Sequence, residues 1–200
     1  MRGVEQIPWL YDAGMVLLEK TGLGRWRSWL AGGARAGRVL DLGCGTGRNL
    51  PLYGEGVRAV GLDPCHESLL AARRRAPGVP LVQARAEALP FRTGVFDSVV
   101  SGLVFCSVGD VPQGLGEVRR VLKAGGVLRM LEHVRASGRV AAWLQDRTQP
   151  AWTWFTGGCH PNRDTEAAVA AAGFEIDPAS RRAQGDMRRF ESHPSARPSP

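Results

Sequence analysis

A glycine-rich turn at residues 43–47 carries the clearest chemical signal in the sequence. It follows an apolar run and Asp41, and glycines occupy the alternate positions 43, 45 and 47. Alternating glycines let a backbone turn tightly and approach a ligand closely, because no Cβ stands in the way. Such a turn marks the binding crevice of an α/β sheet. Asp41 favours a ligand that carries positive charge or hydrogen-bond donors.

Two phosphate-binding alternatives do not match this turn. A dinucleotide fingerprint has the spacing Gly-x-Gly-x-x-Gly and brings a helix N-terminus to a pyrophosphate. Here the spacing is Gly-x-Gly-x-Gly, and the acid before it would repel a pyrophosphate. A Walker loop needs Gly-Lys followed by Ser or Thr, and the sequence contains no such tripeptide. The turn therefore favours a cationic ligand over an anionic one.

Three further segments follow the turn in chain order, each at the end of a predicted strand. Asp63 ends the second strand, where an acid can accept hydrogen bonds from both hydroxyls of a ribose. Residues 84–91 follow the third strand and can hold an adenine ring, and Ser101 ends the fourth strand. We therefore expect a nucleoside-containing ligand to contact Asp41, Gly43, Cys44, Gly45, Asp63, Pro64, Ala86, Glu87 and Ser101.

The elements that position these residues alternate between strand and helix. Short apolar segments predict strands near 38–43, 57–62, 79–84, 95–101, 126–132 and 173–178, with a possible seventh near 186–192. Helical patterns lie near 48–53, 66–75, 112–123, 138–148 and 163–172, after an amphipathic stretch at 12–34. This alternation predicts a doubly wound, mostly parallel α/β sheet with an antiparallel final strand. We expect one domain over 1–192, capped by a helical segment at 1–35, and a disordered tail at 193–200.

Local signals place several helix boundaries. Asp110 and Pro112 are typical of a helix start, and either Asp164 or Asn162 can cap the helix that ends at Gly173. Gly125 is expected to end the helix at 112–123, because glycine readily takes the left-handed conformation beyond a helix terminus.

Composition narrows the class of protein. The chain has 200 residues and a net charge of +7, nearly all from arginine, and its four cysteines are spread singly. No apolar stretch is long enough to span a membrane, and no secretory signal is apparent. The cysteine spacing favours neither a disulfide framework nor a metal site, so a cytoplasmic protein without a metal is expected. Because the arginines are scattered, the charge argues only weakly for nucleic acid.

Taken together, these motifs resemble class I S-adenosylmethionine (SAM)-dependent methyltransferases over nearly the whole chain. Residues 41–47 are similar to the family's first motif, Asp63 to its ribose-binding acid, and 84–91 to its adenine loop. The resemblance implies a seven-stranded sheet with a reversed final hairpin, SAM as methyl donor and S-adenosylhomocysteine as product. It also implies that Gly43 and Gly45 lie against the methionine part of SAM. Many members have an Asp where this chain has Arg85, so adenine contact is expected through Ala86 and Glu87.

The C-terminal half is similar to a narrower group, the animal methyltransferase-like proteins that methylate alkyl thiols. Residues 103–108, 117–126, 131–134 and 149–165 carry this resemblance, although those enzymes have an N-terminal membrane anchor that is not seen here. It implies a small apolar acceptor such as a thiol. A quinone, phenol, lipid headgroup or amine is the alternative acceptor, and a SAM-binding protein without turnover is a further alternative.

Nucleic-acid methylation fits the sequence less well. The amino methyltransferases of nucleic acids place Asp/Asn-Pro-Pro-aromatic after the fourth strand, where this chain has residues 101–106 without that motif. The Pro64-Cys65 pair follows the second strand, on the ribose side, where a cytosine-directed nucleophile is not found. A tRNA methyltransferase is therefore the last of the alternatives.

The acceptor side is predicted from aromatic and titratable residues. His133 follows the fifth strand and is the candidate catalytic base. Aromatic residues near the start of the chain (Trp9, Tyr11) and at 152–155 are expected to form a lid over the carboxyl ends of the strands. The predicted acceptor pocket comprises Tyr11, Phe105, Trp152 and His160. The sequence leaves the oligomeric state open.

Overall fold

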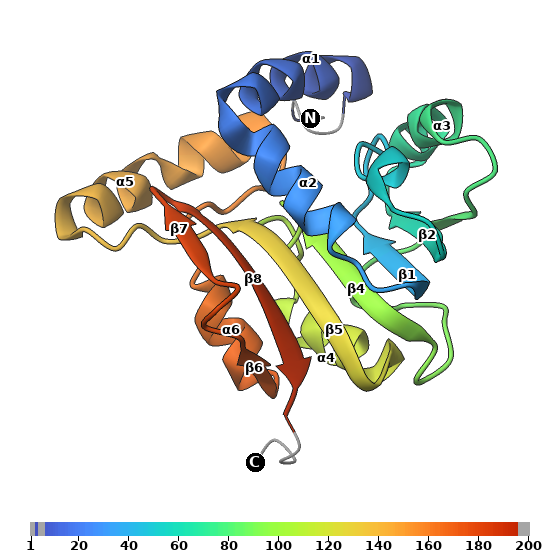
Figure 1. Ribbon diagram of the computed structural model, residues 1–200. Helices are drawn as coiled ribbons and strands as arrows, with labels where there is room; N and C mark the ends of the chain where they lie inside the picture. Colours follow the sequence, from blue (N-terminus) through green and yellow to red (C-terminus); the bar gives the residue numbers. More distant parts are fainter. Residues whose placement is uncertain (1–2, 4–6, 196–200) are drawn as a thin grey trace.

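A single mixed sheet forms the centre of the molecule (Figure 1). The computed structural model describes residues 3 and 7–195. The strands are β1 (Gly37–Leu42), β2 (Val57–Asp63), β3 (Leu81–Gln83), β4 (Phe96–Gly102), β5 (Leu122–His133), β6 (Phe174–Ile176), β7 (Arg182–Gln184) and β8 (Met187–Pro194). They follow the order β3-β2-β1-β4-β5-β8-β6, and β7 pairs with β8. Strands β1 to β5 pair in parallel, whereas β8 is antiparallel to β5, β6 and β7. This arrangement confirms the predicted doubly wound fold.

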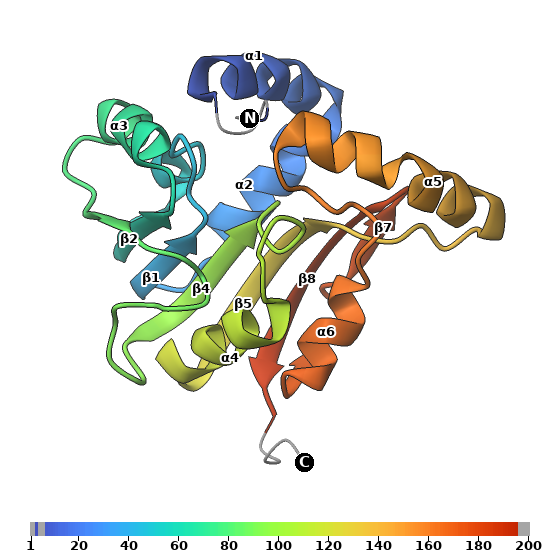
Figure 2. The ribbon, with the colours of Figure 1, turned by 180° about the vertical axis from the view of Figure 1, so that it is seen from behind.

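Helices cover both faces of the sheet (Figures 1 and 2). They are α1 (Pro8–Leu18), a π-helical turn (Glu19–Leu23), α2 (Gly24–Gly32), a 3₁₀ turn (Leu50–Leu52), α3 (His66–Arg75), α4 (Val111–Val121), α5 (Arg139–Thr156) and α6 (Thr165–Ala171). The amphipathic stretch predicted at 12–34 is thus broken between α1 and α2, where Gly22 has a φ of +122°. Helices α1 and α5 lie beyond the upper edge of the sheet in Figure 1, where the parallel strands end.

Alternate residues of the central strands build two hydrophobic cores. Val39 and Val100 pack with Leu30 of α2 on one face. Leu40 and Val99 face the other way, into the larger core that α4 and α6 close. Because neighbouring strand residues point to opposite faces, two apolar runs supply both cores, as expected for a doubly covered sheet.

Several predicted boundaries need correction. The helix expected at 48–53 is only the 3₁₀ turn, because Tyr53 takes an extended conformation. Asp110 starts α4 as predicted, accepting a hydrogen bond from the Gln113 backbone at 2.9 Å. Gly125 does not end that helix: α4 stops at Val121 and β5 begins at once. Gly125, with a φ of +73°, lies inside β5 beside a shift in the pairing of β5 with β4, the usual position of a glycine at a bulge.

The end of the sheet also differs from the prediction. The short strand β7 makes eight strands in place of seven. Strand β8 continues to Pro194, and the Ser195 backbone donates to the Gly173 carbonyl at 2.8 Å, so the predicted boundary at residue 192 is wrong. The strand extends further because β6 pairs with it at Phe174 and Pro194. The remainder of the predicted tail, 196–200, lies outside the described residues.

Candidate cofactor and acceptor site

A cavity of about 930 Å³ opens at the carboxyl ends of the parallel strands. Its wall is formed by the glycine turn, the end of β2, residues 85–87, residues 102–104 and 106–109, His133, and parts of α1 and α5. The predicted residues on this wall are Tyr11, Gly43, Gly45, Asp63, Pro64, Ala86, Glu87, His133 and Trp152. The fold therefore gathers most of the predicted cofactor side and part of the predicted acceptor side around one space.

The three positions of the turn require glycine for different structural reasons. Gly43, Gly45 and Gly47 all have positive φ, at +62°, +52° and +78°. A Cβ on Gly43 would lie 2.4 Å from Cγ2 of Val104, and one on Gly47 would lie 2.9 Å from Cβ of Ala72. A Cβ on Gly45 would meet no protein atom within 4 Å. Gly43 and Gly47 thus allow close packing, whereas Gly45 leaves open space on the cavity wall.

Asp63 is fixed beside Gly45 at the end of β2. Its Oδ2 accepts a hydrogen bond from the Gly45 backbone, and its Oδ1 accepts one from the Cys65 backbone, both at 2.9 Å. Burial raises the pKa of this carboxyl, and the two backbone donors oppose that shift. Each oxygen keeps a further lone pair, so a carboxylate held this way fits the two hydroxyls of a ribose.

Glu87 braces the loop that the sequence predicts to hold adenine. Its Oε1 accepts hydrogen bonds from the backbones of Gly109 and Asp110, at 3.0 and 3.3 Å. Gln113 donates back to the Glu87 carbonyl at 2.9 Å. The carboxylate therefore joins the 85–87 loop to the start of α4, while Ala86 beside it forms part of the wall.

Three predicted cofactor residues lie behind the cavity wall and do not line it: Asp41, Cys44 and Ser101. Asp41 is fully buried and accepts a hydrogen bond from the Asn49 side chain at 3.0 Å; burial raises its pKa to about 7. Burial likewise raises the pKa of the Cys44 thiol. Asp41, through Asn49, and Cys44, whose backbone donates to the Leu62 carbonyl at 2.9 Å, support the shape of the glycine turn. Asp41 is fully buried and does not line the cavity.

Ser101 leads to Glu132, a buried acid that the sequence interpretation did not assign to the site. Its Oε1 accepts hydrogen bonds from the Ser101 hydroxyl at 3.1 Å and from the backbones of Val104 and Phe105 at 3.0 and 3.2 Å. Burial raises its pKa, and these donors oppose the shift. The acid holds the loop after β4, in which Leu103 has a φ of +62°. The sequence signal that could have identified Glu132 is an acid near the end of an otherwise apolar strand.

His133 is paired with Asp186, a residue that the sequence interpretation missed. The imidazole Nδ1 lies 3.2 Å from Oδ2 of Asp186, in the turn between β7 and β8. Burial lowers the pKa of His133, but the hydrogen bond and charge of Asp186, helped by Cys159 and Glu132, raise it above the ordinary value. Since Asp186 occupies Nδ1, Nε2 is the nitrogen left for a group in the cavity.

Two predicted acceptor residues do not reach the cavity. Phe105 is fully buried in the larger core, because the turn after β4 directs its ring inward. His160 is held by Nδ1 to the Gly158 carbonyl at 2.7 Å and lies off the wall. Their neighbours Cys106 and Cys159 line the cavity instead. Among the described residues, no group of His, Cys, Asp and Glu is arranged to hold a metal ion.

The predicted lid is divided between cavity and solvent. Tyr11 of α1 and Trp152 and Phe155 of α5 line the cavity. Trp9 and Trp154, on the same helices, are 73% and 70% exposed and face away from it. The two helices thus cover the cavity with part of their apolar surface and present the rest outward.

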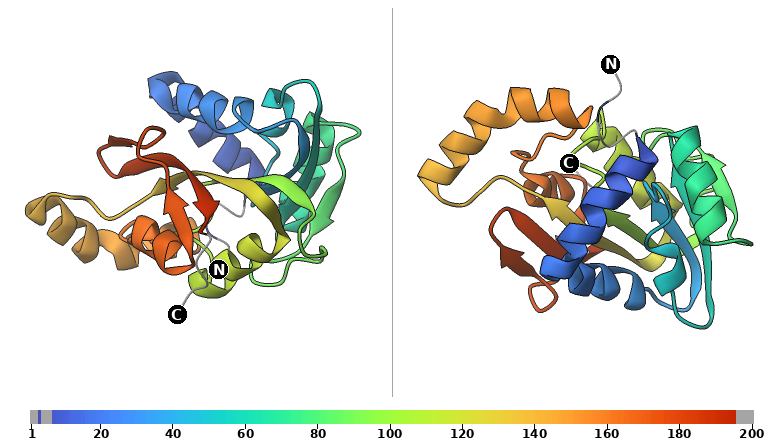
Figure 3. Two further views of the ribbon diagram at one scale, coloured as in Figure 1. Left: turned by 60° about the horizontal axis from the view of Figure 1, so that its bottom comes forward. Right: turned by 90° about the horizontal axis from the view of Figure 1, so that it is seen from above.

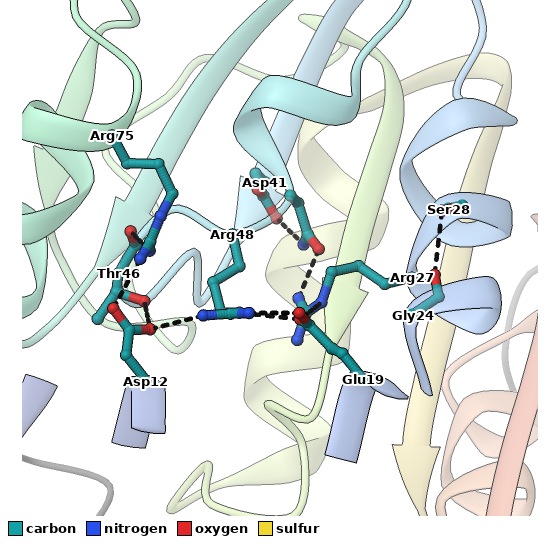
Figure 4. A network of polar contacts seen from close by, with 10 residues as sticks. Asp12, Glu19, Gly24, Arg27, Ser28, Asp41, Thr46, Arg48 and Arg75 are labelled. Carbon is teal, nitrogen blue, oxygen red and sulfur yellow. Dashed lines mark hydrogen bonds and ion pairs between the residues drawn. The ribbon is translucent and has the colours of Figure 1, made fainter. Parts of the chain in front are cut away.

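Ion pairs fasten α1 to the glycine turn (Figure 4). Asp12 accepts hydrogen bonds from the Thr46 hydroxyl and from Arg75, both at 2.7 Å, and pairs with Arg48. Glu19, just after α1, pairs with Arg48 and Arg27. These cations outweigh burial at Asp12 and keep its pKa, and that of Glu19, below the ordinary value.

The same network continues inward to Asp41. Arg27 donates to the Asn49 side chain at 2.7 Å, and Asn49 donates to Asp41. The position of α1 is therefore coupled to the turn that should meet the cofactor.

Known proteins share this sequence pattern and fold. The methyltransferase domain family matches residues 40–130. A human thiol S-methyltransferase is 37% identical over 153 residues, which cover 72% of this chain and 63% of that protein. A phosphatidylethanolamine N-methyltransferase from Cereibacter sphaeroides is 37% identical over 116 residues, covering 54% of this chain and 57% of that protein. The chain thus spans less than two thirds of the length of these curated relatives.

A solved structure shows the same fold over nearly the whole chain. The SAM-dependent methyltransferase from Thermotoga maritima superposes with a TM-score of 0.71 at 20% identity, covering 93% of this chain and 96% of that one. No helix in the described part of the chain is long and apolar enough to cross a membrane. On its motifs, its fold and these relatives, the chain belongs to the class I SAM-dependent methyltransferase family.

Proposed function

We propose that this chain transfers a methyl group from SAM to a small apolar acceptor, with a thiol as the first candidate. The observation that carries the proposal is one cavity with Gly45 and Asp63 on its wall together with His133, Tyr11 and Trp152. At about 930 Å³ it lies near the top of the range of about 300–1,000 Å³ typical of small-molecule sites. Such a space has room for a nucleoside cosubstrate and a small second molecule.

The cofactor side fits SAM in its donor set and its shape. Asp63 offers two oriented carboxylate oxygens for ribose hydroxyls, and Gly45 offers open space at a positive φ. When bound, SAM supplies an electrophilic methyl group on a sulfonium. The residues named here hold it by hydrogen bonding and close packing.

On the acceptor side, His133 would take the proton of the acceptor. A thiol has an ordinary pKa of about 8.5, so only a few per cent is thiolate at neutral pH. In the proposed step the thiol proton moves to Nε2 of His133, and Asp186 stabilises the resulting imidazolium at Nδ1. The sulfur lone pair then forms the bond to the methyl carbon as the sulfonium bond breaks. Tyr11 and Trp152 would exclude water and hold the nucleophile in line.

A quinone, phenol, amine or lipid headgroup remains the alternative acceptor class. The relative from Cereibacter sphaeroides is named for methylating the amine of a phospholipid headgroup, so amines belong in the same test. His133 could remove a proton from a phenol or an ammonium as well as from a thiol.

An acceptor screen tests the proposal. The purified chain is incubated with SAM and with representative alkyl thiols, phenols, quinones and amines, and S-adenosylhomocysteine release is measured. We expect the largest release with an alkyl thiol, and release from that acceptor should fall at least about 100-fold in His133→Gln. If none of the acceptor classes gives S-adenosylhomocysteine release above background, the chain binds SAM without turnover. A larger release from a phenol or amine would replace the thiol in the proposal.

A further inference from the structure

Helix α5 has its amphipathic pattern turned outward. Val140, Trp143 and Trp154 are 80%, 64% and 70% exposed, and Leu144 is also exposed. These positions follow the spacing of one helix face. A surface helix normally buries its apolar face against the core, and a large apolar patch left in solvent marks an interaction site.

The inward side of α5 also carries polar side chains, and their hydrogen bonds fix the helix in this orientation. The Gln145 amide donates to the Val134 and Pro161 carbonyls, at 3.2 and 2.8 Å, and accepts from the Ala136 backbone at 2.9 Å. Thr153 donates to the Cys159 carbonyl at 2.7 Å. Turning the helix over to bury its tryptophans would leave these groups unsatisfied, so the exposed apolar face is part of the folded structure.

Helix α1 adds to the same side of the molecule. Trp9, Val16 and Leu17 are exposed on it. Seen from above, α1 and α5 both lie over the edge of the sheet at which the cavity opens (Figure 3, right). We call the exposed apolar side chains of these two helices the α1–α5 face. Tyr11 and Trp152, on the same helices, line the cavity beside it.

The charges around this face are basic. Arg139 and Arg147 are exposed on α5 and make no hydrogen bond or ion pair with the part of the chain that the structure describes. The one acid in α5, Asp146, is paired with Arg135. The acids of the α1 segment, Asp12 and Glu19, are turned to arginines in the network of Figure 4. The face therefore combines aromatic and aliphatic side chains with uncompensated positive charge.

We propose that the α1–α5 face binds the surface of a membrane that contains anionic phospholipid. Tryptophan is favoured at the membrane–water interface, and basic side chains beside an apolar helix face attract anionic headgroups. A second copy of the chain fits this face less well. A two-fold contact would pair the face with itself and bring Arg147 against the same cations, while the acids described on these two segments are already paired with arginines.

Membrane binding would also affect how an acceptor arrives. The cavity opens beside the α1–α5 face, so an apolar acceptor dissolved in the lipid could reach His133 without crossing water. This consequence rests on the proposed function. The binding itself does not, because it needs neither SAM nor turnover.

Vesicle binding of the full chain tests the inference. Flotation is measured with vesicles of phosphatidylcholine alone and of phosphatidylcholine mixed with phosphatidylglycerol, at low and high salt. We expect binding to the anionic vesicles, accompanied by a blue shift of tryptophan fluorescence, and weaker binding to the neutral vesicles and at high salt. Trp143→Ser with Trp154→Ser should weaken binding about tenfold or more, and Arg147→Glu about fivefold or more.

Matched variants away from the face serve as controls. Leu52→Ser removes an exposed apolar side chain, and Arg92→Glu makes the same change of charge; both should bind vesicles like the unmodified chain. The altered side chains are exposed, so circular dichroism and thermal unfolding should show intact folding in every variant. The inference is overturned if the unmodified chain binds neither kind of vesicle. It is overturned equally if the double variant Trp143→Ser, Trp154→Ser binds anionic vesicles as well as the unmodified chain does. The inference is also overturned if the chain forms a stable dimer that does not bind vesicles and that dissociates when Trp143 is replaced by Ser.

Discussion

The two sides of the cavity are built in different ways. The cofactor side depends on short loops at neighbouring strand ends, where the backbone of Gly45 meets Asp63. The acceptor side is assembled from segments far apart in the chain: α1, α5, the end of β5 and the turn that carries Asp186. Backbone geometry is strongly constrained by local sequence, whereas a wall of side chains depends on the whole fold. This difference explains how one sheet can keep a cosubstrate site and vary the acceptor.

The largest effect should come from Gly45→Ala on the cofactor side. The added Cβ meets no protein atom, but φ is +52°, so folding should lose about 1–2 kcal/mol while the Cβ enters the ligand space. We expect SAM binding to weaken at least about 100-fold in calorimetry. Gly94→Ala is the control, because Gly94 also has a positive φ and an open Cβ position, but lies off the cavity. Equal weakening of SAM binding by both changes would contradict a close approach of the ligand to Gly45.

The next effect concerns proton transfer on the acceptor side. A general base works in its neutral form, and the pKa of His133 is raised, so kcat/KM should fall as pH drops through a value above 6.5. Asp186→Asn removes the partner that holds this pKa up. The acid limb of the pH profile should therefore move to lower pH in this variant, with kcat reduced about tenfold or more because the imidazolium loses its partner. If the acid limb of the pH profile stays where it is in Asp186→Asn, Asp186 does not take part in catalysis.

A smaller effect is expected from replacing Trp152 of the lid, which should change acceptor binding and leave SAM binding intact. Trp152→Ala removes an aromatic wall of the acceptor pocket, so the acceptor KM should rise about tenfold while the Kd of SAM stays nearly constant. Trp154→Ala, assayed with a water-soluble acceptor, is the matched control because Trp154 faces solvent. Equal loss of SAM and acceptor binding in Trp152→Ala would show that the lid is not specific to the acceptor.

The smallest effect should come from the ion pairs that join α1 to the glycine turn. The pKa values of Asp12 and Glu19 are lowered in the folded chain. Their contribution to stability is therefore complete above their unfolded values, about 3.8 and 4.5, and is lost as pH falls through the lower folded values. Arg48→Gln should reduce the free energy of unfolding by about 1 kcal/mol at neutral pH, and by less in acid. If the difference in the free energy of unfolding between the unmodified chain and Arg48→Gln does not shrink as the pH falls, Arg48 stabilises the fold by packing alone.

The sequence predicts the cofactor side better than the acceptor side, for physical reasons. The glycine turn and Asp63 are local signals, and the structure brings them together as expected. Asp186 could not be found this way: it lies beside a three-residue exposed strand, in a turn that resembles an ordinary hairpin. Only the folded sheet places it 3.2 Å from His133. Phe105 shows the same limit, because the direction of its ring is decided by a turn that Glu132 holds from another strand.

Titration calorimetry of SAM with Asp63→Ala tests the central assignment, that this cavity holds SAM through the end of β2. Glu55→Ala, at an exposed acid off the cavity, is the control, and thermal unfolding checks that both variants are folded. We predict that the unmodified chain and Glu55→Ala bind SAM alike and that Asp63→Ala binds at least about tenfold more weakly, since two ribose hydroxyls lose their acceptor. An unchanged Kd in folded Asp63→Ala would contradict the assignment.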